Sequence, residues 1–148
     1  MVKAINVGNE KSAIESLTLL KENKYEDLEI RLHNTHITDL NKVLGKNVFK
    51  NGAVYASGIM FWEIMQPLGE KGKHHYHNLT PENVYKALST MRYSENVSLS
   101  YDNRYVIITL ATIEDGISIA VIVTPEGHTK KLIRRNVVRI ITIYPCKK

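Results

Sequence analysis

The spacing of hydrophobic residues changes near residue 92, and the predicted secondary structure changes with it. Before this point, apolar residues recur three and four positions apart, which is typical of helices buried on one face. Helix starts are marked by Asn9, by Ser57 and most clearly by the run Thr80-Pro81-Glu82. There a capping hydroxyl precedes a proline and an acid in the first turn. The expected core face of that helix holds Val84, Ala87, Leu88 and Met91.

Two short stretches of the first part are strand-like. Apolar residues alternate with charged ones over residues 28–32, and Val54–Ala56 is a short apolar run. Between them, a helix is expected from Thr35 to a stop at Gly45, because glycine is the residue that most readily ends a helix in the left-handed conformation. Helical signals nevertheless dominate this part of the chain.

From residue 96 onward the hydrophobic period becomes two, which is typical of strands. Asp102-Asn103 and Glu114-Asp115-Gly116 have the composition of tight turns, and residues 125–136 are predicted to form a polar loop. The predicted strands are Val97–Tyr101, Arg104–Ile113, Ile117–Thr124 and Val137–Tyr144. The sequence therefore predicts an α+β fold, in which N-terminal helices are followed by a four-stranded antiparallel β-meander.

Length and composition favour a single domain of the ordinary globular kind. The chain has 148 residues, 43% of them hydrophobic and 24% charged. It holds no apolar run of the roughly 20 residues needed to cross a bilayer, and its start lacks the apolar stretch of a signal peptide. One cysteine, Cys146, excludes an intrachain disulfide. We expect a cytoplasmic protein without a membrane partner.

The positive charge is concentrated in the second half. Residues 1–70 hold eight Lys/Arg against nine Asp/Glu, a net charge of −1, whereas residues 71–148 hold twelve against six, a net charge of +6. A one-sided positive field favours a surface that faces a polyanion such as nucleic acid. Charge that serves only solubility is the alternative.

Residues 72–78 hold three histidines, His74, His75 and His77, directly before a helix start. Imidazole is the side chain best suited to proton transfer at neutral pH, and a helix start suits a phosphate. Lys73 and Asn78 are candidates for binding the same phosphate. Two alternatives remain: a solvated polar loop without a role, or a metal site on His75 and His77, which lacks the third and fourth ligands that zinc prefers.

Further candidates lie in the strand-rich half. Lys130, Arg134 and Arg135 could position a phosphate, or form a charged surface connector. Arg104 follows the first tight turn, where it is a phosphate contact or an edge-strand charge. Thr142 and Tyr144 are two positions apart on one strand and therefore share a sheet face, where they could donate to a phosphoryl oxygen or simply pack.

Two tyrosines beside the first tight turn complete the candidates. Tyr101 and Tyr105 could stack on a base. Paired tyrosines in a hairpin also pack against each other across strands, and this alternative stays open.

Several of these stretches together resemble a known family. They are Val54-Tyr55-Ala56-Ser57-Gly58, Phe61-Trp62-Glu63-Ile64, the run from Lys73 to Glu82, Asn103-Arg104-Tyr105-Val106-Ile107, and the run from Asn136 to Pro145. The chain resembles phage and mobile-element nuclease domains of the barnase–EndoU–colicin–RelE superfold, as found in MuF-type toxin modules. The resemblance spans roughly residues 50–146, with the histidine run and the Thr-Ile-Tyr-Pro ending as its most specific motifs.

This resemblance implies a metal-independent endoribonuclease of the toxin type that needs no cofactor. The 2′-hydroxyl would attack the adjacent phosphate, with His75 or His77 as acid or base. The residues implied to hold the phosphate are Arg104, Thr142 and Tyr144, and those expected to bind the substrate are Lys73, His74, Asn78, Lys130, Arg134 and Arg135.

The resemblance also implies partners and a division of the chain. RNA, including tRNA, is the expected partner, and an immunity protein or antitoxin is a second one. The site of action would be the cytoplasm, including that of a target cell. Residues 49–148 would form the nuclease core and residues 1–48 a helical extension or cap. The alternative function is a non-catalytic module of a phage or mobile element that binds nucleic acid or protein.

Overall fold

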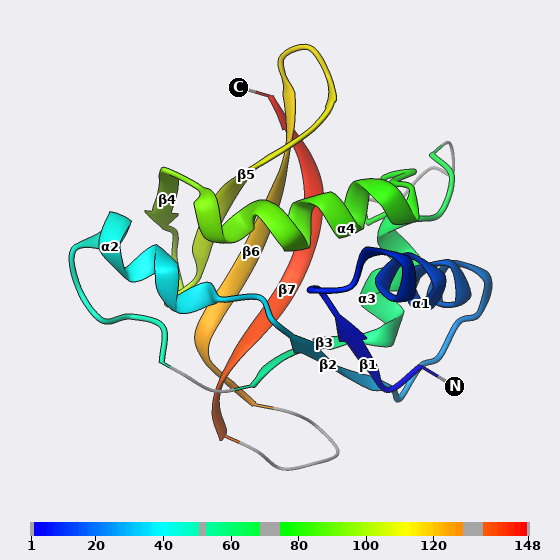
Figure 1. Cartoon of the computed structure of the whole chain (residues 1–148), viewed down its shortest axis with the longest axis horizontal. Coiled ribbons are helices and arrows are strands. Elements are labelled where there is room, and N and C mark those ends of the chain that lie inside the picture. Colours follow the sequence, from blue (N-terminus) through cyan, green and yellow to red (C-terminus); the bar gives the residue numbers. More distant parts are fainter. Residues whose placement is uncertain (1, 51–52, 69–74, 129–134, 148) are drawn as a thin grey trace.

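A seven-stranded mixed sheet organises the fold, and the longest described helices lie against it (Figure 1). The computed structural model describes residues 2–50, 53–68, 75–128 and 135–147, and of residues 128, 135 and 136 it describes the backbone alone. Within these residues the strands are β1 (Ala4–Asn6), β2 (Glu29–His33), β3 (Val54–Ser57), β4 (Asn96–Leu99), β5 (Tyr105–Glu114), β6 (Ile117–His128) and β7 (Arg135–Lys147). The helices are α1 (Glu10–Glu22), α2 (Asn41–Leu44), α3 (Gly58–Ile64) and α4 (Pro81–Thr90), with 3-10 turns η1 (Ile37–Leu40) and η2 (Met91–Tyr93).

The order of strands across the sheet is β1-β2-β3-β7-β6-β5-β4. Neighbours from β7 to β4 are antiparallel, and β2 is antiparallel to β3. Two pairings are parallel, β1 with β2 and β3 with β7. The sheet therefore joins the first and last strands of the chain through the short strand β3.

The predicted arrangement, N-terminal helices followed by a four-stranded antiparallel meander, is wrong. The structure is α+β with three further strands, β1 to β3, that extend the sheet beyond β7. β1 has only three residues, too few for an alternating pattern to be recognised. β2 and β3 have the expected alternation or apolar run, but Val54 on β3 pairs with Val138 on β7, far away in the sequence. Local spacing does not encode such a pairing.

The polar loop predicted over residues 125–136 is also shorter than expected. β6 continues to His128, and β7 begins again at Arg135. The register shifts between Thr124 and Gly127, so Pro125 lies in a bulge, where a missing backbone N–H is tolerated. Residues 125–128 and 135–136 of this polar stretch therefore lie in strands.

The predicted helix starts are confirmed. The side chains of Asn9 and Ser57 accept hydrogen bonds from the backbone N–H groups of Ser12 (3.1 Å) and Met60 (3.2 Å). Thr80 and Asn83 form a reciprocal capping box, each side chain accepting from the other residue's backbone N–H at 3.0 Å. The predicted core face is confirmed as well, since Val84, Ala87 and Leu88 on α4 and Met91 at the start of η2 are fully buried.

The helix α4 packs on β5 and β6, which gives the sheet two different faces. Alternate residues such as Ile107 and Val121 point into the core under α4, and they pair with each other across the strands. Their neighbours, such as Val106 and Ile122, point to the opposite face. We name this second side, which α4 does not cover, the far face.

The division at residue 48 stays a prediction. In the structure, β2 lies before this boundary and β3 lies after it, and the two strands pair over Glu29–Leu32 and Val54–Ser57. Ile5 and Leu17 from the first part belong to the same buried core as Val84 and Ile107 from the second. None of the described helices is long and apolar enough to cross a membrane.

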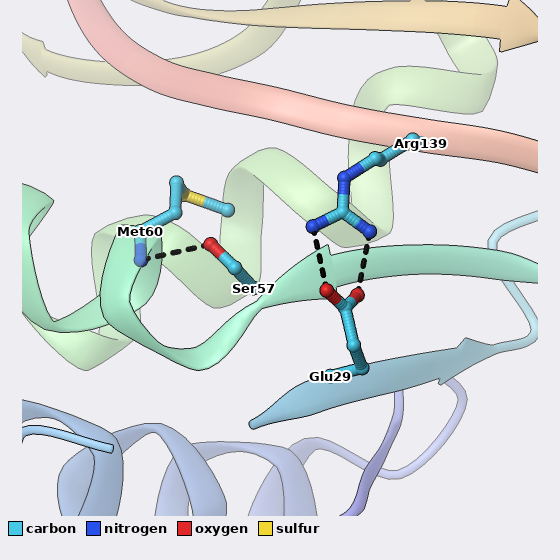
Figure 2. A network of polar contacts seen from close by, with 4 residues as sticks. All are labelled: Glu29, Ser57, Met60 and Arg139. Carbon is cyan, nitrogen blue, oxygen red and sulfur yellow. Dashed lines mark hydrogen bonds and ion pairs between the residues drawn. The ribbon is translucent and has the colours of Figure 1, made fainter. Parts of the chain in front are cut away.

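An ion pair on the far face connects β2 directly to β7. Two guanidinium nitrogens of Arg139 donate to the two carboxylate oxygens of Glu29, at 2.5 and 2.9 Å, over the intervening strand β3 (Figure 2). The Glu29 side chain is 8% exposed and the Arg139 side chain 15%. Such burial makes each charge dependent on the other, because neither can recover its hydration if its partner is removed.

We therefore expect the replacement Arg139→Leu to lower the free energy of unfolding by about 3 kcal/mol, because it leaves the Glu29 carboxylate buried and unpaired. The double replacement of Glu29 and Arg139 by leucine should lose much less, since no buried charge then remains. Chemical denaturation at pH 7 measures both values.

The matched control is Arg92→Leu. Arg92 pairs with Asp39 at 2.7 Å, but these side chains are 28% and 40% exposed. Breaking this more exposed pair should cost about 1 kcal/mol or less. If Arg139→Leu and Arg92→Leu lowered the free energy of unfolding equally, burial would not make the pair of Glu29 and Arg139 more sensitive to the loss of one partner.

Candidate functional site

The described part of the histidine segment, residues 75–78, lies between α3 and α4 and is fixed at its C-terminal end. The Asn78 N–H donates to the Gln66 carbonyl at 2.8 Å, and the Leu79 N–H donates to the Ile64 carbonyl at 3.1 Å. Leu79 is buried in the core, whereas Asn78 has a positive φ of 53° and an exposed side chain. The two backbone hydrogen bonds therefore hold the segment against the end of α3.

An aromatic contact holds the middle of the same segment. The Tyr76 ring meets the Trp62 ring edge to face, with 5.7 Å between centroids and 87° between planes. The Lys24 ammonium lies 5.1 Å from the centroid of the Trp62 ring, which is within the range of a cation–π contact. Tyr76, which separates His75 from His77, is thus held against α3.

His75 and His77 differ in their surroundings. His75 is exposed, whereas His77 is half-buried. Partial burial lowers the pKa of His77 below its ordinary value of 6.5, and the nearby His75 lowers it further. His77 is therefore neutral at pH 7, the form in which an imidazole nitrogen accepts a proton. Two neighbouring imidazoles can in principle supply the base and the acid of a proton transfer.

Thr142 and Tyr144 lie on the far face of β7. Thr142 is opposite Ile122 and Tyr144 is opposite Ala120, in a part of the sheet where a register shift precedes Thr142. Both side chains are half-buried. Burial, and then the nearby Cys146, raise the pKa of Tyr144 above its ordinary value of 10.0. At neutral pH its hydroxyl keeps its proton and can donate a hydrogen bond.

Arg104 closes the turn between β4 and β5 and is partly buried. Its backbone N–H donates to the Tyr101 carbonyl at 3.2 Å, and its carbonyl accepts from the Ser100 N–H at 2.7 Å. Asp102 and Asn103 in the turn both have a φ of 56°, which confirms the predicted two-residue turn with positive φ.

The two tyrosines beside this turn differ. Tyr105 is 4% exposed and meets Phe49 edge to face at 5.5 Å, so it packs in the core and does not stack on a base. Tyr101 is 74% exposed. Of the pair, Tyr101 is the one whose ring a base could reach.

The predicted catalytic residues come from three separate places in the fold: the segment before α4, the turn between β4 and β5, and the strand β7. His75 and His77 are neighbours on one segment, and Thr142 and Tyr144 share the far face of β7. Among the described residues, no hydrogen bond or ion pair connects the histidine segment to Arg104, Thr142 or Tyr144. The predicted catalytic roles of Arg104, Thr142 and Tyr144 stay predictions.

Several predicted binding residues lie outside the described part of the chain. They are Lys73, His74, Lys130 and Arg134. Arg135 is described as the first backbone position of β7, opposite His128. The predicted roles of these residues stay predictions.

A polar cavity at the end of β2 has no counterpart among the predicted residues. Its volume is about 230 Å³, and its lining includes Arg31, His33, His36 and Lys50. The signal in the sequence is the spacing of two histidines three positions apart, directly after an alternating strand. The histidine spacing alone does not reveal the cavity, because Lys50 lies close to these histidines only after β2 has paired with β3.

Comparison of the chain with protein-family models, with curated proteins and with solved structures finds no match. Within the described residues, no group of three or more His, Cys, Asp or Glu side chains is arranged to hold a metal ion.

The lowered pKa of His77 predicts a loss of stability in mild acid. Above pH 6.5 the imidazole is neutral in both the folded and the unfolded chain, so it has no effect there. As the pH falls below 6.5 the unfolded chain binds the proton first, and the folded state is destabilised until the pH lies below the folded pKa. We expect His77→Gln to reduce the drop in melting temperature between pH 7.5 and pH 5.

The check is a melting series for the wild type and the variant, with His77 followed by NMR titration. The imidazole should titrate with a midpoint below 6.5. A midpoint at or above 6.5, or identical pH dependence in both proteins, would contradict this description of His77.

Proposed function

We propose that the chain is an endoribonuclease that cleaves RNA without a metal, using His77 as the base and His75 as the acid. The observation that supports this most directly is the pair itself, with His77 half-buried and neutral at pH 7 beside an exposed His75. Cleavage of RNA through its own 2′-hydroxyl requires one group to accept a proton and another to donate one.

In the proposed reaction, the neutral His77 imidazole takes the proton of a 2′-hydroxyl. The 2′-oxygen forms a bond to the adjacent phosphorus, the bond from phosphorus to the 5′-oxygen breaks, and His75 gives a proton to that oxygen. The products are a 2′,3′-cyclic phosphate and a free 5′-hydroxyl. The contact of Tyr76 with Trp62 keeps the two histidines in a fixed relation, which such a transfer needs.

The charge of the chain supports RNA as the substrate. Residues 71–148 carry a net charge of +6, and these residues include both histidines. Arg104, Thr142 and Tyr144 are proposed to position the RNA strand along the far face. The resemblance to phage nuclease domains points in the same direction.

A second candidate function is RNA binding without cleavage. It is favoured by the lack of a described hydrogen bond or ion pair between the histidine segment and the residues expected to hold the phosphate. The two functions share the basic surface and differ only in whether the RNA remains intact.

Cleavage of an oligoribonucleotide in the presence of EDTA distinguishes the two functions. We expect discrete products from the wild type, and a rate about 10²–10⁴-fold lower for His77→Ala, the usual contribution of a general base or acid. Denaturing gels measure the rate, and a melting curve checks that the variant is folded. Lys86→Gln, an exposed position on α4, is the control and should cleave at the wild-type rate. Intact RNA that still shifts on a native gel would instead establish the binding module.

The chemistry of the attack gives a separate prediction. A substrate with a single 2′-deoxynucleotide 5′ to the cleaved bond lacks the attacking oxygen, so it should bind with unchanged affinity and not be cut. Product analysis by mass spectrometry should find a cyclic phosphate on the unmodified RNA. Cleavage of the deoxy substrate at the same rate would exclude the proposed reaction.

A further inference from the structure

The cavity at the end of β2 is lined by cations that have no acidic partner. Arg31 and Lys50 carry permanent charge at neutral pH, and His33 and His36 add imidazole N–H donors. Among the described residues that line it there is no carboxylate. The cavity therefore concentrates positive charge and hydrogen-bond donors in a small space.

Two partly buried arginines of the described chain, by contrast, have acidic partners. Arg139 is paired with Glu29, and Arg92 is paired with Asp39, the acid of the neighbouring turn η1. Asp39 is thus already engaged by Arg92, and among the described residues it forms no ion pair with Arg31 or Lys50. Within the described residues, neither Arg31 nor Lys50 forms an ion pair, so both remain available to an external anion.

The loop that forms one wall of the cavity is held in place by side-chain hydrogen bonds. The Asn6 side-chain oxygen accepts from the Asn34 amide at 2.6 Å and from the Gly8 N–H at 2.9 Å. The Val7 N–H donates to the His33 carbonyl at 2.9 Å. These bonds tie the loop to the turn between β1 and α1, so the wall exists before any ligand binds.

The backbone of the loop is unusual. Asn34 and His36 have φ values of 64° and 53°, in the left-handed region that non-glycine residues seldom occupy. Between them Thr35 is 5% exposed, and Ile37 after them is 3% exposed. This conformation turns the chain sharply at the end of β2, while the buried residues anchor the turn in the core.

Size and charge together indicate the ligand. A volume of about 230 Å³ lies below the roughly 300–1,000 Å³ of cavities that hold drug-sized molecules. Two permanent cations match a phosphomonoester, whose charge at neutral pH is about −1.5 to −2, better than a phosphodiester with one negative charge. A guanidinium group such as that of Arg31 can donate two parallel hydrogen bonds to two phosphoryl oxygens. An ammonium group such as that of Lys50 adds a point charge.

We propose that this cavity binds the phosphoryl group of a phosphomonoester, with Arg31 and Lys50 as its charged contacts and His33 and His36 as additional donors. The ligand is a free phosphate, a nucleotide or the phosphorylated 5′ end of an RNA, which share this chemistry. The proposal is independent of RNA cleavage by His75 and His77.

Calorimetric titration of the full chain tests the proposal with inorganic phosphate, adenosine 5′-monophosphate and adenosine. The two phosphorylated probes should bind and adenosine should not. Arg31→Gln and Lys50→Gln should each weaken binding about tenfold or more, as expected for loss of a hydrogen bond to a charged group. Melting curves check the folding of both variants, whose altered side chains are exposed.

The matched control is Lys46→Gln, which removes the same charge from an exposed position outside the cavity lining. It should change the affinity less than about twofold, because Lys46 does not line the cavity and salt screens an exposed charge that makes no direct contact with the ligand. His77→Ala should bind adenosine 5′-monophosphate like the wild type, which separates this site from the proposed nuclease site.

A 2′-O-methyl oligonucleotide, which cannot be cleaved through a 2′-hydroxyl, distinguishes the sources of the phosphate. Tighter binding of its 5′-phosphorylated form than of its 5′-hydroxyl form, lost in Arg31→Gln, assigns the site to RNA ends. Equal affinity for both forms, with Arg31-dependent binding of the small probes, assigns it to free phosphates or nucleotides. Failure of every phosphorylated probe to bind at millimolar concentration, or equal weakening by Lys46→Gln and Arg31→Gln, would overturn the proposal.

Discussion

The fold depends on the short parallel pairing of β3 with β7. Two residue pairs, Val54 with Val138 and Tyr55 with Arg139, connect β1 and β2 to the rest of the sheet. The ion pair between Glu29 and Arg139 reinforces this connection from the far face. Gly127 makes room for it, because a Cβ atom at that position would lie 2.7 Å from the Cβ of Arg139. The order of the whole sheet follows from this one junction.

Features encoded over a few neighbouring residues could be predicted from the sequence. The helix starts at Asn9, Ser57 and Thr80 and the turn at Asp102-Asn103 rest on hydrogen bonds and backbone angles within four residues. The position of the histidine segment before α4 follows for the same reason. Each of these is a local preference that acts before the chain has a tertiary structure.

Features that depend on distant pairing could not be predicted. The strand β1 is too short to show a pattern, and the parallel partner of β3 lies more than eighty residues away. The cavity at β2 also depends on such pairing, since Arg31 and Lys50 come from separate strands and connections. The sequence likewise gives no distance between the histidine segment and Arg104, which belong to different elements of the fold.

The net charge of each half of the sequence does not give the charge of any one part of the molecular surface. The first 70 residues carry a net charge of −1, yet they supply the cationic cavity. Two of their acids, Glu29 and Asp39, are occupied by arginines of the second half. Pairing between the halves thus removes negative charge from one part of the surface and leaves Arg31 and Lys50 unbalanced there. Local potential depends on which charges meet, and the sum along the chain does not determine it.

The brevity of β3 also leaves the later part of β7 with only one strand beside it. Within the described sheet β3 pairs with β7 no further than Arg139, whereas β7 continues to Lys147 against β6. A strand edge without a neighbouring strand can pair with a strand from another molecule, which is the first step of sheet-based aggregation. Pro145 lies in this stretch opposite Ile119, and it has no backbone N–H that could donate a hydrogen bond to an added strand. Pro145 therefore makes this edge a poorer partner for a strand of another molecule.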